Sequence, residues 1–130
     1  MKYVLIIVAA MAALAVFMLA GKGNLLMGGG KALDNIIDMV RNEKDIILLD
    51  VRTPEEYMEK RIPGSILLPN YEIKDRATDV IPDKNARIVV YCRSGRRSAE
   101  AANTLRELGY SNVFDLGGIN NWPYETISGE

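Results

Sequence analysis

Two short, almost entirely apolar runs, each followed by the start of a helix, limit the possible folds of this chain more than any other feature. IILLD (residues 46–50) and RIVVYC (residues 87–92) have the length of strands rather than of helices. Strands that are apolar at nearly every position are typical of a parallel sheet covered by helices on both faces. The two runs therefore predict an α/β fold built around a buried parallel sheet.

Helix signals follow both runs. After the first, Thr53 suits the N-cap position, Pro54 the first helical position, and Glu56 completes a capping box. After the second, we expect Ser98 to cap a helix that ends at Gly109. A strand, a turn and a helix thus occur twice, as in the repeating unit of an α/β domain.

The remaining segments complete this pattern. They are an amphipathic helix from Lys31, a strand in SILLP (65–69), a short surface helix in 71–80, a strand in NVFDL (112–116) and a last short helix near Trp122. We expect Trp122 to belong to the core, because a lone tryptophan after a turn lies more often in the core or at its rim than in a substrate pocket. The predicted architecture is a three-layer α/β/α sandwich around a short parallel sheet.

The N-terminus carries the longest apolar run, YVLIIVAAMAALAVFMLA (residues 3–20). Its length lies near the lower limit for a membrane-spanning helix and exceeds the apolar part of a secretory signal, and the cleavage sites next to it are poor. We therefore expect residues 1–21 to form an apolar helix that anchors the chain in a membrane, with a cleaved signal segment as the alternative. Residues 22–30 are interpreted as a glycine-rich tether and residues 31–130 as the folded domain.

Flanking charges give little guidance on orientation, because Lys2 precedes the apolar run and Lys22 follows it. A short N-terminus before a first apolar segment usually stays inside, so we expect the domain to face the periplasm or the cell exterior. If the segment is a cleaved signal, the domain is instead an exported soluble protein.

The composition excludes several classes of function. The chain has no histidine, which removes Cys–His proteases, the usual serine triad and histidine metal sites. Its single cysteine allows neither an intrachain disulfide nor a CxxC redox pair. Without Lys2 and Lys22, 14 basic residues face 17 acidic ones, a net charge of −3 that gives no attraction for nucleic acid. We expect no metal and no cofactor.

The cysteine is the strongest candidate for chemistry. Cys92 ends the run RIVVYC, and in parallel sheets ligands bind beyond the carboxyl ends of the strands. Backbone N–H groups that lead into a helix bind anions and stabilise a thiolate. The expected loop and helix start consist of Arg93, Ser94, Gly95, Arg96, Arg97 and Ser98. We interpret Cys92 as a thiolate nucleophile in a cradle for an oxyanion; the alternative is a structural cysteine beside a solvated loop.

Other charged residues have simpler interpretations. Asp50 and Arg52 follow the first strand and could reach the edge of the site, but we expect them to be a supporting structural pair. The charged residues of the next helix are interpreted as a solvated face; they are Glu55, Glu56, Glu59 and Lys60.

Three motifs resemble the rhodanese family of sulfurtransferase domains. They are LLDVRTPEEYMEKRIPGSILLP, CRSGRRS and VFDLGGINNW, and the resemblance covers about residues 32–124. It implies that Cys92 takes sulfane sulfur from a small anionic donor such as thiosulfate and holds it as a persulfide. A thiol, or cyanide in the assay, then accepts the sulfur. The sequence departs from the family at Arg61, where histidine is usual, at a position that looks structural.

Two other functions stay open. Cell-cycle phosphatases of the same fold carry a loop that is one residue longer, whereas Cys92 to Arg97 has the sulfurtransferase length, so a phosphatase or arsenate reductase is the less favoured enzyme. A sulfur-carrier or partner-binding module with little turnover is the other alternative. The intact cysteine argues against a module that only binds.

Overall fold

A computed structural model describes residues 30–130. The predicted anchor and most of the predicted tether lie outside these residues. Within residues 30–130, no helix combines the length and the apolar character needed to cross a membrane.

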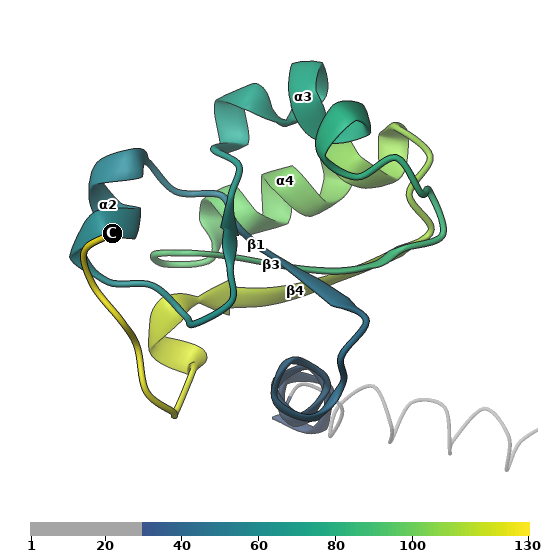
Figure 1. Cartoon of the computed structure of the whole chain (residues 1–130). Helices are drawn as coiled ribbons and strands as arrows, with labels where there is room; N and C mark the ends of the chain where they lie inside the picture. Colours follow the sequence, from purple (N-terminus) through teal and green to yellow (C-terminus); the bar gives the residue numbers. More distant parts are fainter. Residues whose placement is uncertain (1–29) are drawn as a thin grey trace, which may run out of the picture. The chain divides into compact units, whose positions relative to one another are not determined.

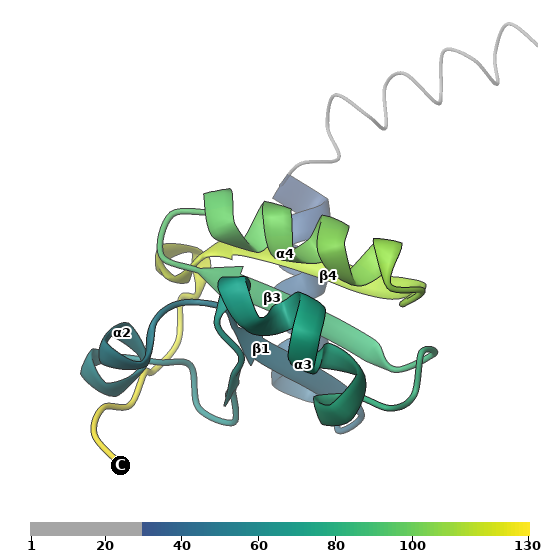
Figure 2. The same cartoon turned by 90° about the horizontal axis from the view of Figure 1, so that it is seen from above.

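The described part of the chain forms one sheet of parallel strands (Figure 2). The strands are β1 (Ile46–Asp50), β2 (Ile66–Leu67), β3 (Arg87–Cys92) and β4 (Asn112–Gly118). Their order across the sheet is β2-β1-β3-β4, so the two apolar runs occupy the centre. This confirms the prediction of a parallel sheet, because central strands are the ones that bury both faces.

Helices lie on both sides of this sheet. They are a helix over residues 30–42, α2 (Pro54–Glu59), α3 (Ile73–Val80) and α4 (Arg96–Glu107), with short 3-10 turns η1 (Asn70–Glu72) and η2 (Ile119–Asn121). Figures 1 and 2 show α3 and α4 together on one face and residues 35–42 on the opposite one. The helix predicted at Pro54 begins there, with Thr53 and Glu56 forming the predicted capping box.

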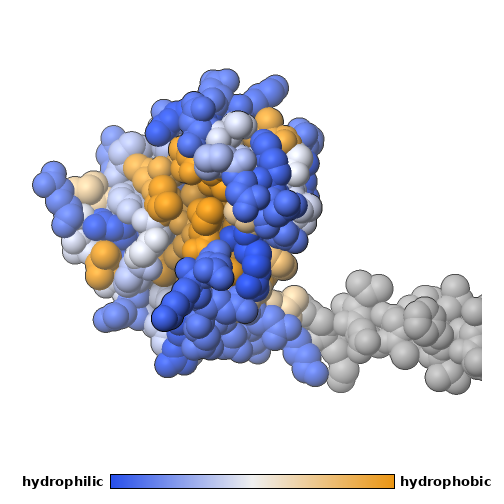
Figure 3. Space-filling view, turned by 45° about the vertical axis from the view of Figure 1, so that its right-hand side comes forward, coloured by the Kyte–Doolittle hydropathy of each residue, from blue (hydrophilic) through white to orange (hydrophobic). Residues whose placement is uncertain are grey.

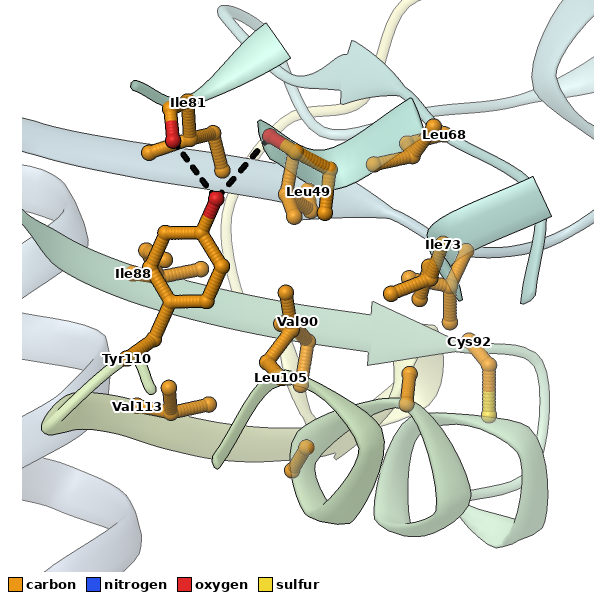
Figure 4. Close-up of a cluster of buried hydrophobic side chains, with 14 residues drawn as sticks. Leu49, Leu68, Ile73, Ile81, Ile88, Val90, Cys92, Leu105, Tyr110 and Val113 are labelled. Carbon is orange, nitrogen blue, oxygen red and sulfur yellow. Dashed lines mark hydrogen bonds between the residues drawn. The ribbon is translucent and has the colours of Figure 1, made fainter. Parts of the chain in front are cut away.

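The larger core lies between the sheet and the pair α3 and α4 (Figure 4). The short surface helix predicted in 71–80 is confirmed as α3: its polar residues are exposed, while Ile73 and Ala77 have no exposed surface and join the core. The Tyr110 hydroxyl, after α4, lies 3.0 Å from the Ala77 carbonyl oxygen and 2.6 Å from that of Ile81. These contacts tie the end of α3 to the end of α4 and satisfy a buried hydroxyl.

Trp122 does not belong to this core. Its side chain is half-buried, stacks edge-on against Tyr124 at 5.3 Å between ring centroids, and donates to the carbonyl oxygen of Glu125 at 3.0 Å. The prediction of a core tryptophan was therefore wrong. The indole N–H finds its partner in the C-terminal segment, which keeps the ring near the surface.

Exposed apolar side chains remain outside the core. Ile66 in the edge strand β2 is 47% exposed, and β2 pairs with β1 only at Leu49 and Asp50. Figure 3 shows an apolar area in the middle of one face, bordered by hydrophilic side chains. Most of the surface in that view is hydrophilic.

An irregularity in β4 brings two glycines beside the end of β3. Val90 pairs with Asp115, but Tyr91 pairs with Gly117, so Leu116 is an extra residue in β4. Such a bulge bends a strand and is common next to active sites. As a result β4 continues two residues beyond the predicted NVFDL, and Gly118 lies opposite Cys92.

Candidate active site

Cys92 is the last residue of β3, and the loop after it is short. Helix α4 begins at Arg96, with Gly95 as its N-cap in the left-handed region at φ +105°. The prediction that Ser98 caps this helix, and that the loop runs to residue 97, was therefore wrong. Glycine reaches a positive φ at no steric cost, so the chain turns into the helix three residues earlier than a cap at Ser98 predicts.

The Cys92 thiol lies beside the start of α4. The residue has no exposed surface, and the Gly95 N–H donates to its Sγ at 2.9 Å. Figure 4 shows this side chain at one end of the core, beside the start of α4. The sulfur thus meets the end of the helix where N–H groups are free and the dipole is positive.

Two effects compete at this thiol. Burial raises the pKa of Cys92, but hydrogen bonds from the Ser98 side chain and from neighbouring backbone N–H groups outweigh it and lower the pKa below its ordinary value. The N–H groups belong to Ser98, Gly95 and Ser94. The Ser98 hydroxyl also lies 3.0 Å from the Gly95 carbonyl oxygen. Because the hydroxyl has one proton, we expect it to turn to the sulfur when the thiolate forms, since a charged acceptor binds more strongly.

Replacing Ser98 by alanine should therefore raise the pKa of Cys92. The thiolate loses one charge-assisted hydrogen bond, a contribution of about 1.5 to 3 kcal/mol. The pH titration of the thiolate absorbance in the ultraviolet measures this change. Ser94→Ala is the matched control, because Ser94 stabilises the thiolate through its backbone N–H, which alanine keeps, and not through its hydroxyl. Equal midpoints in the two variants would contradict this role of the Ser98 hydroxyl.

Gly118 supports the loop from the side of β4. A Cβ atom at this position would lie 2.6 Å from the carbonyl oxygen of Arg93 and 3.2 Å from the Cα of Ser94. Both neighbours are backbone atoms, which cannot swing aside as a flexible side chain does. Only glycine therefore allows this approach of β4 to the loop. The sequence analysis ended this strand at Leu116 and did not predict the contact.

The three arginines of the loop differ in their surroundings. Arg97 donates through Nη1 and Nη2 to the two carboxylate oxygens of Glu56, at 2.7 and 2.9 Å. Arg96 is highly exposed, with Nε 3.7 Å from a carboxylate oxygen of Glu100. Arg93 is exposed and has no side-chain partner among residues 30–130. Among these three arginines, Arg93 is therefore the one whose guanidinium has no partner in the described part of the chain.

Glu56 is a site residue that the sequence analysis missed. It was interpreted as part of a solvated face, but its side chain is only 18% exposed and joins α2 to α4. The Arg97 guanidinium lowers the pKa of Glu56 to about 2, and the Thr53 backbone N–H contributes to this effect. The two residues lie 41 positions apart, so no local pattern could have indicated their pairing.

The effect of Glu56 on stability should depend on pH. The pKa of Glu56 in the folded protein lies below its ordinary value of 4.5. The carboxylate therefore contributes fully to the free energy of unfolding above pH 4.5, and this contribution is lost as the pH falls towards 2. At neutral pH we expect Glu56→Gln to lower the free energy of unfolding by about 1 to 3 kcal/mol. Urea unfolding at pH 7 and at pH 3 measures the difference between wild type and variant.

Glu55→Gln is the control for this experiment, because Glu55 has no side-chain partner in the described part of the chain. The difference in unfolding free energy between wild type and Glu56→Gln should be smaller at pH 3 than at pH 7. Glu55→Gln should have an unfolding free energy near that of wild type at both pH values. A gap that is unchanged at pH 3 would contradict the ion pair as the source of the effect.

Asp50 and Arg52 form a buried ion pair at the end of β1. Arg52 donates through Nη2 to Asp50 Oδ2 at 2.6 Å and through Nε to Oδ1 at 2.9 Å. Its Nη2 also donates to the carbonyl oxygen of Lys60, at the end of α2. The structure thus places these two supporting residues together, as a brace between β1 and α2. Both charges are satisfied, which leaves neither of them free for a ligand.

Arg61 also has structural contacts. Its Nη1 donates to the carbonyl oxygens of Tyr57 and Gly129, and its backbone pairs with Ile127. The guanidinium therefore holds the C-terminal segment against α2.

Within residues 30–130, no group of three or more His, Cys, Asp or Glu side chains is placed to hold a metal ion.

The fold and the cysteine loop can now be compared with known proteins. The family model for the rhodanese-like domain matches residues 33–124. The chain belongs to the rhodanese-like family. Its fold is therefore a rhodanese-like α/β fold with a parallel sheet, as the motifs implied.

Named relatives support this assignment. The thiosulfate sulfurtransferase PspE of Escherichia coli (strain K12) is 38% identical over 81 residues, which are 62% of this chain and 78% of the relative. A sulfurtransferase of Allochromatium vinosum is 36% identical over 90 residues, 68% of this chain and 82% of the relative. The solved structure described as a rhodanese with anions from E. coli matches with a TM-score of 0.62 and 37% identity, covering 65% of this rhodanese-like chain and 99% of that one.

Proposed function

We propose that this rhodanese-like chain is a thiosulfate sulfurtransferase that carries sulfane sulfur on Cys92. One observation supports this most: the Cys92 thiol accepts the Gly95 N–H at the start of α4, where it is stabilised as a thiolate. The names of relatives at 36 to 38% identity point to the same reaction.

The first half of the reaction loads the cysteine. The Cys92 thiolate attacks the outer sulfur of thiosulfate; a bond forms between Sγ and that sulfur. The sulfur–sulfur bond of thiosulfate breaks, and its electron pair leaves with sulfite. No histidine is present to act as a base, so the thiolate must exist before the donor arrives. The lowered pKa of Cys92 favours this thiolate.

The second half returns the enzyme to its starting state. An acceptor thiolate, or cyanide, attacks the outer sulfur of the Cys92 persulfide and removes it. The electron pair of the broken bond returns to Sγ. The N–H groups around the sulfur stabilise the departing thiolate as they stabilised the attacking one. Because Cys92 has no exposed surface here, some movement around Sγ has to precede the attack on donor or by acceptor.

A comparison of two substrates tests this function against the phosphatase or arsenate reductase alternative. The loop from Cys92 to Arg97 is one residue shorter than the phosphatase form, and its Arg97 is engaged by Glu56 rather than free to bind a phosphate. We expect sulfur transfer from thiosulfate to cyanide and only background cleavage of an aryl phosphate. Efficient cleavage of the phosphate without sulfur transfer would overturn the assignment. Loading without turnover would instead indicate a sulfur carrier.

We further propose that residues 3–20 anchor the enzyme in a membrane, with the catalytic domain facing the periplasm or the cell exterior. The support is the length and apolar character of this segment. Carbonate washing of membranes should leave the full-length protein in the pellet with its first residues intact. A soluble form that begins near residue 21 would show a cleaved signal instead.

A further inference from the structure

A cavity of about 490 Å³ opens on the side of the sheet that faces away from α3 and α4. Figure 1 shows residues 35–42 and the yellow C-terminal segment together on that side. The lining residues come from these two segments and from the loop before β2; they are Val40, Arg41, Pro63, Trp122, Tyr124 and Glu125. None of them belongs to the cysteine loop, so the cavity is separate from the active site.

Two aromatic rings form one wall of the cavity. Trp122 is half-buried and lies edge-on against Tyr124, which is 42% exposed. The indole N–H of Trp122 donates to the carbonyl oxygen of Glu125, so the polar group of this ring is satisfied within the protein. Val40 and Pro63 add half-buried apolar surface. Tryptophan and tyrosine side chains with one apolar and one wet side are typical of surfaces at a membrane–water interface.

The cavity also carries one charge of each sign. The Arg41 guanidinium lies 4.2 Å from the centroid of the Tyr124 ring and donates through Nη1 to the Tyr124 hydroxyl at 2.8 Å. It has no carboxylate partner among residues 30–130. The exposed Glu125 carboxylate has neither a hydrogen bond nor an ion pair among the same residues. A cation and a carboxylate without charged partners therefore line one cavity beside aromatic rings.

These charges fit a ligand that carries both an anion and an ammonium group. An unpaired guanidinium favours a phosphate, and an unpaired carboxylate favours an ammonium. The face of a tryptophan ring attracts an ammonium as well. The headgroup of a phosphatidylethanolamine or a phosphatidylcholine joins these two charges in one small unit and continues into apolar chains.

The proposed anchor makes such headgroups the ligand of this type that the domain meets most often. A glycine-rich chain as long as the tether, residues 22–30, spans about 15 to 18 Å, so a protein anchored through residues 3–20 keeps its domain near the bilayer. Tethering raises the effective concentration of the ligand, which makes individually weak contacts sufficient. A zwitterion free in solution has no such advantage.

We propose that this cavity binds the zwitterionic headgroup of a phospholipid and so docks the domain on the membrane surface. Arg41 holds the phosphate, while Glu125 and the Trp122 ring face the ammonium group. The inference rests on the membrane anchor proposed above and is independent of the sulfur-transfer reaction.

Trp122 reports this docking directly, because it is the only tryptophan in the chain. The full-length protein is reconstituted into vesicles of phosphatidylcholine and phosphatidylethanolamine, with and without bromine atoms on the acyl chains close to the headgroup. Bromine quenches tryptophan emission only at close range. We expect a roughly twofold loss of Trp122 emission in the brominated vesicles, since a docked ring lies at the level of the headgroups. Equal emission in the two kinds of vesicle would overturn the proposal.

Substitution of Arg41 tests the phosphate contact. Arg41→Gln should lower the ratio of docked to undocked protein, obtained from the quenched fraction, about threefold, and Arg41→Lys should largely restore it. Arg76→Gln is the matched control, because Arg76 is an exposed arginine of α3, on the opposite side of the sheet. Equal effects of Arg41→Gln and Arg76→Gln would overturn the proposal, since loss of charge rather than the cavity would then be responsible.

Glu125 should determine which lipids bind. Phosphatidylglycerol carries the phosphate but no ammonium group, so we expect about threefold less docking on vesicles of this lipid. Glu125→Gln should remove most of this difference between the lipids. Glu107→Gln, which removes an exposed carboxylate at the end of α4, should keep it. A difference that both substitutions reduce equally would overturn the proposal, because net charge would then explain the choice of lipid.

The outcomes separate this proposal from those made above. Protein that leaves the vesicles on carbonate washing would overturn the anchor and this inference together. Protein that stays with the vesicles without quenching of Trp122 would overturn the headgroup site and leave the anchor intact. Sulfur transfer from thiosulfate to cyanide should be the same in all of these variants, because the cavity shares no residue with the cysteine loop.

Discussion

Replacing Cys92 by serine is expected to abolish sulfur transfer from thiosulfate to cyanide while the domain stays folded. A serine hydroxyl is hardly ionised near neutral pH, and it cannot form a persulfide. We expect a loss of at least about a thousandfold in kcat/KM, because both halves of the reaction pass through the cysteine sulfur. The thiosulfate:cyanide assay measures this loss.

The folded state of this variant must be checked in parallel. Serine is smaller than cysteine and places a hydroxyl where the sulfur accepts the Gly95 N–H, so that hydrogen bond can persist. Urea unfolding should show a cooperative transition close to that of wild type. A folded Cys92→Ser protein that keeps its activity would refute the persulfide mechanism.

Replacing Gly118 by alanine is expected to damage both the loop and the activity. The new Cβ would lie 2.6 Å from the Arg93 carbonyl oxygen, so the loop backbone or the end of β4 must shift. We expect a loss of about 1 to 3 kcal/mol in unfolding free energy, typical of overpacking. Sulfur transfer should fall at least about tenfold, because the N–H groups that face the sulfur belong to the displaced loop.

Gly30→Ala is the control for this substitution. No atom lies within 4 Å of a Cβ built at Gly30, and its φ is not in the positive range, so an alanine there meets no steric conflict. This variant should match wild type in both unfolding free energy and activity. A Gly118→Ala protein that behaves like Gly30→Ala would contradict the view that β4 positions the loop.

Elements whose signals are local could be predicted from the sequence. The apolar runs IILLD and RIVVYC became β1 and β3 at their predicted bounds, because burial on both faces leaves a continuous apolar pattern. The start of α2 was also predicted, since the Thr53–Glu56 capping box lies within four residues. The rhodanese-like motifs then connected these elements to a family.

Features that depend on tertiary contacts could not be predicted in this way. The pairing of Glu56 with Arg97 joins two helices whose relative placement no local pattern encodes. The start of α4 was misplaced because Ser98 is a good N-cap residue, whereas the left-handed conformation of Gly95 decides where the helix begins. The bulge at Leu116, which brings Gly118 to the loop, leaves no periodic signal in a seven-residue strand.

The intact mass of the purified protein after incubation with thiosulfate tests the central claim most directly. The account predicts a gain of one sulfur atom per chain, absent in Cys92→Ser and removed by cyanide with the formation of thiocyanate. An unchanged mass in a folded protein, or a gain of sulfur that persists in Cys92→Ser, would contradict it.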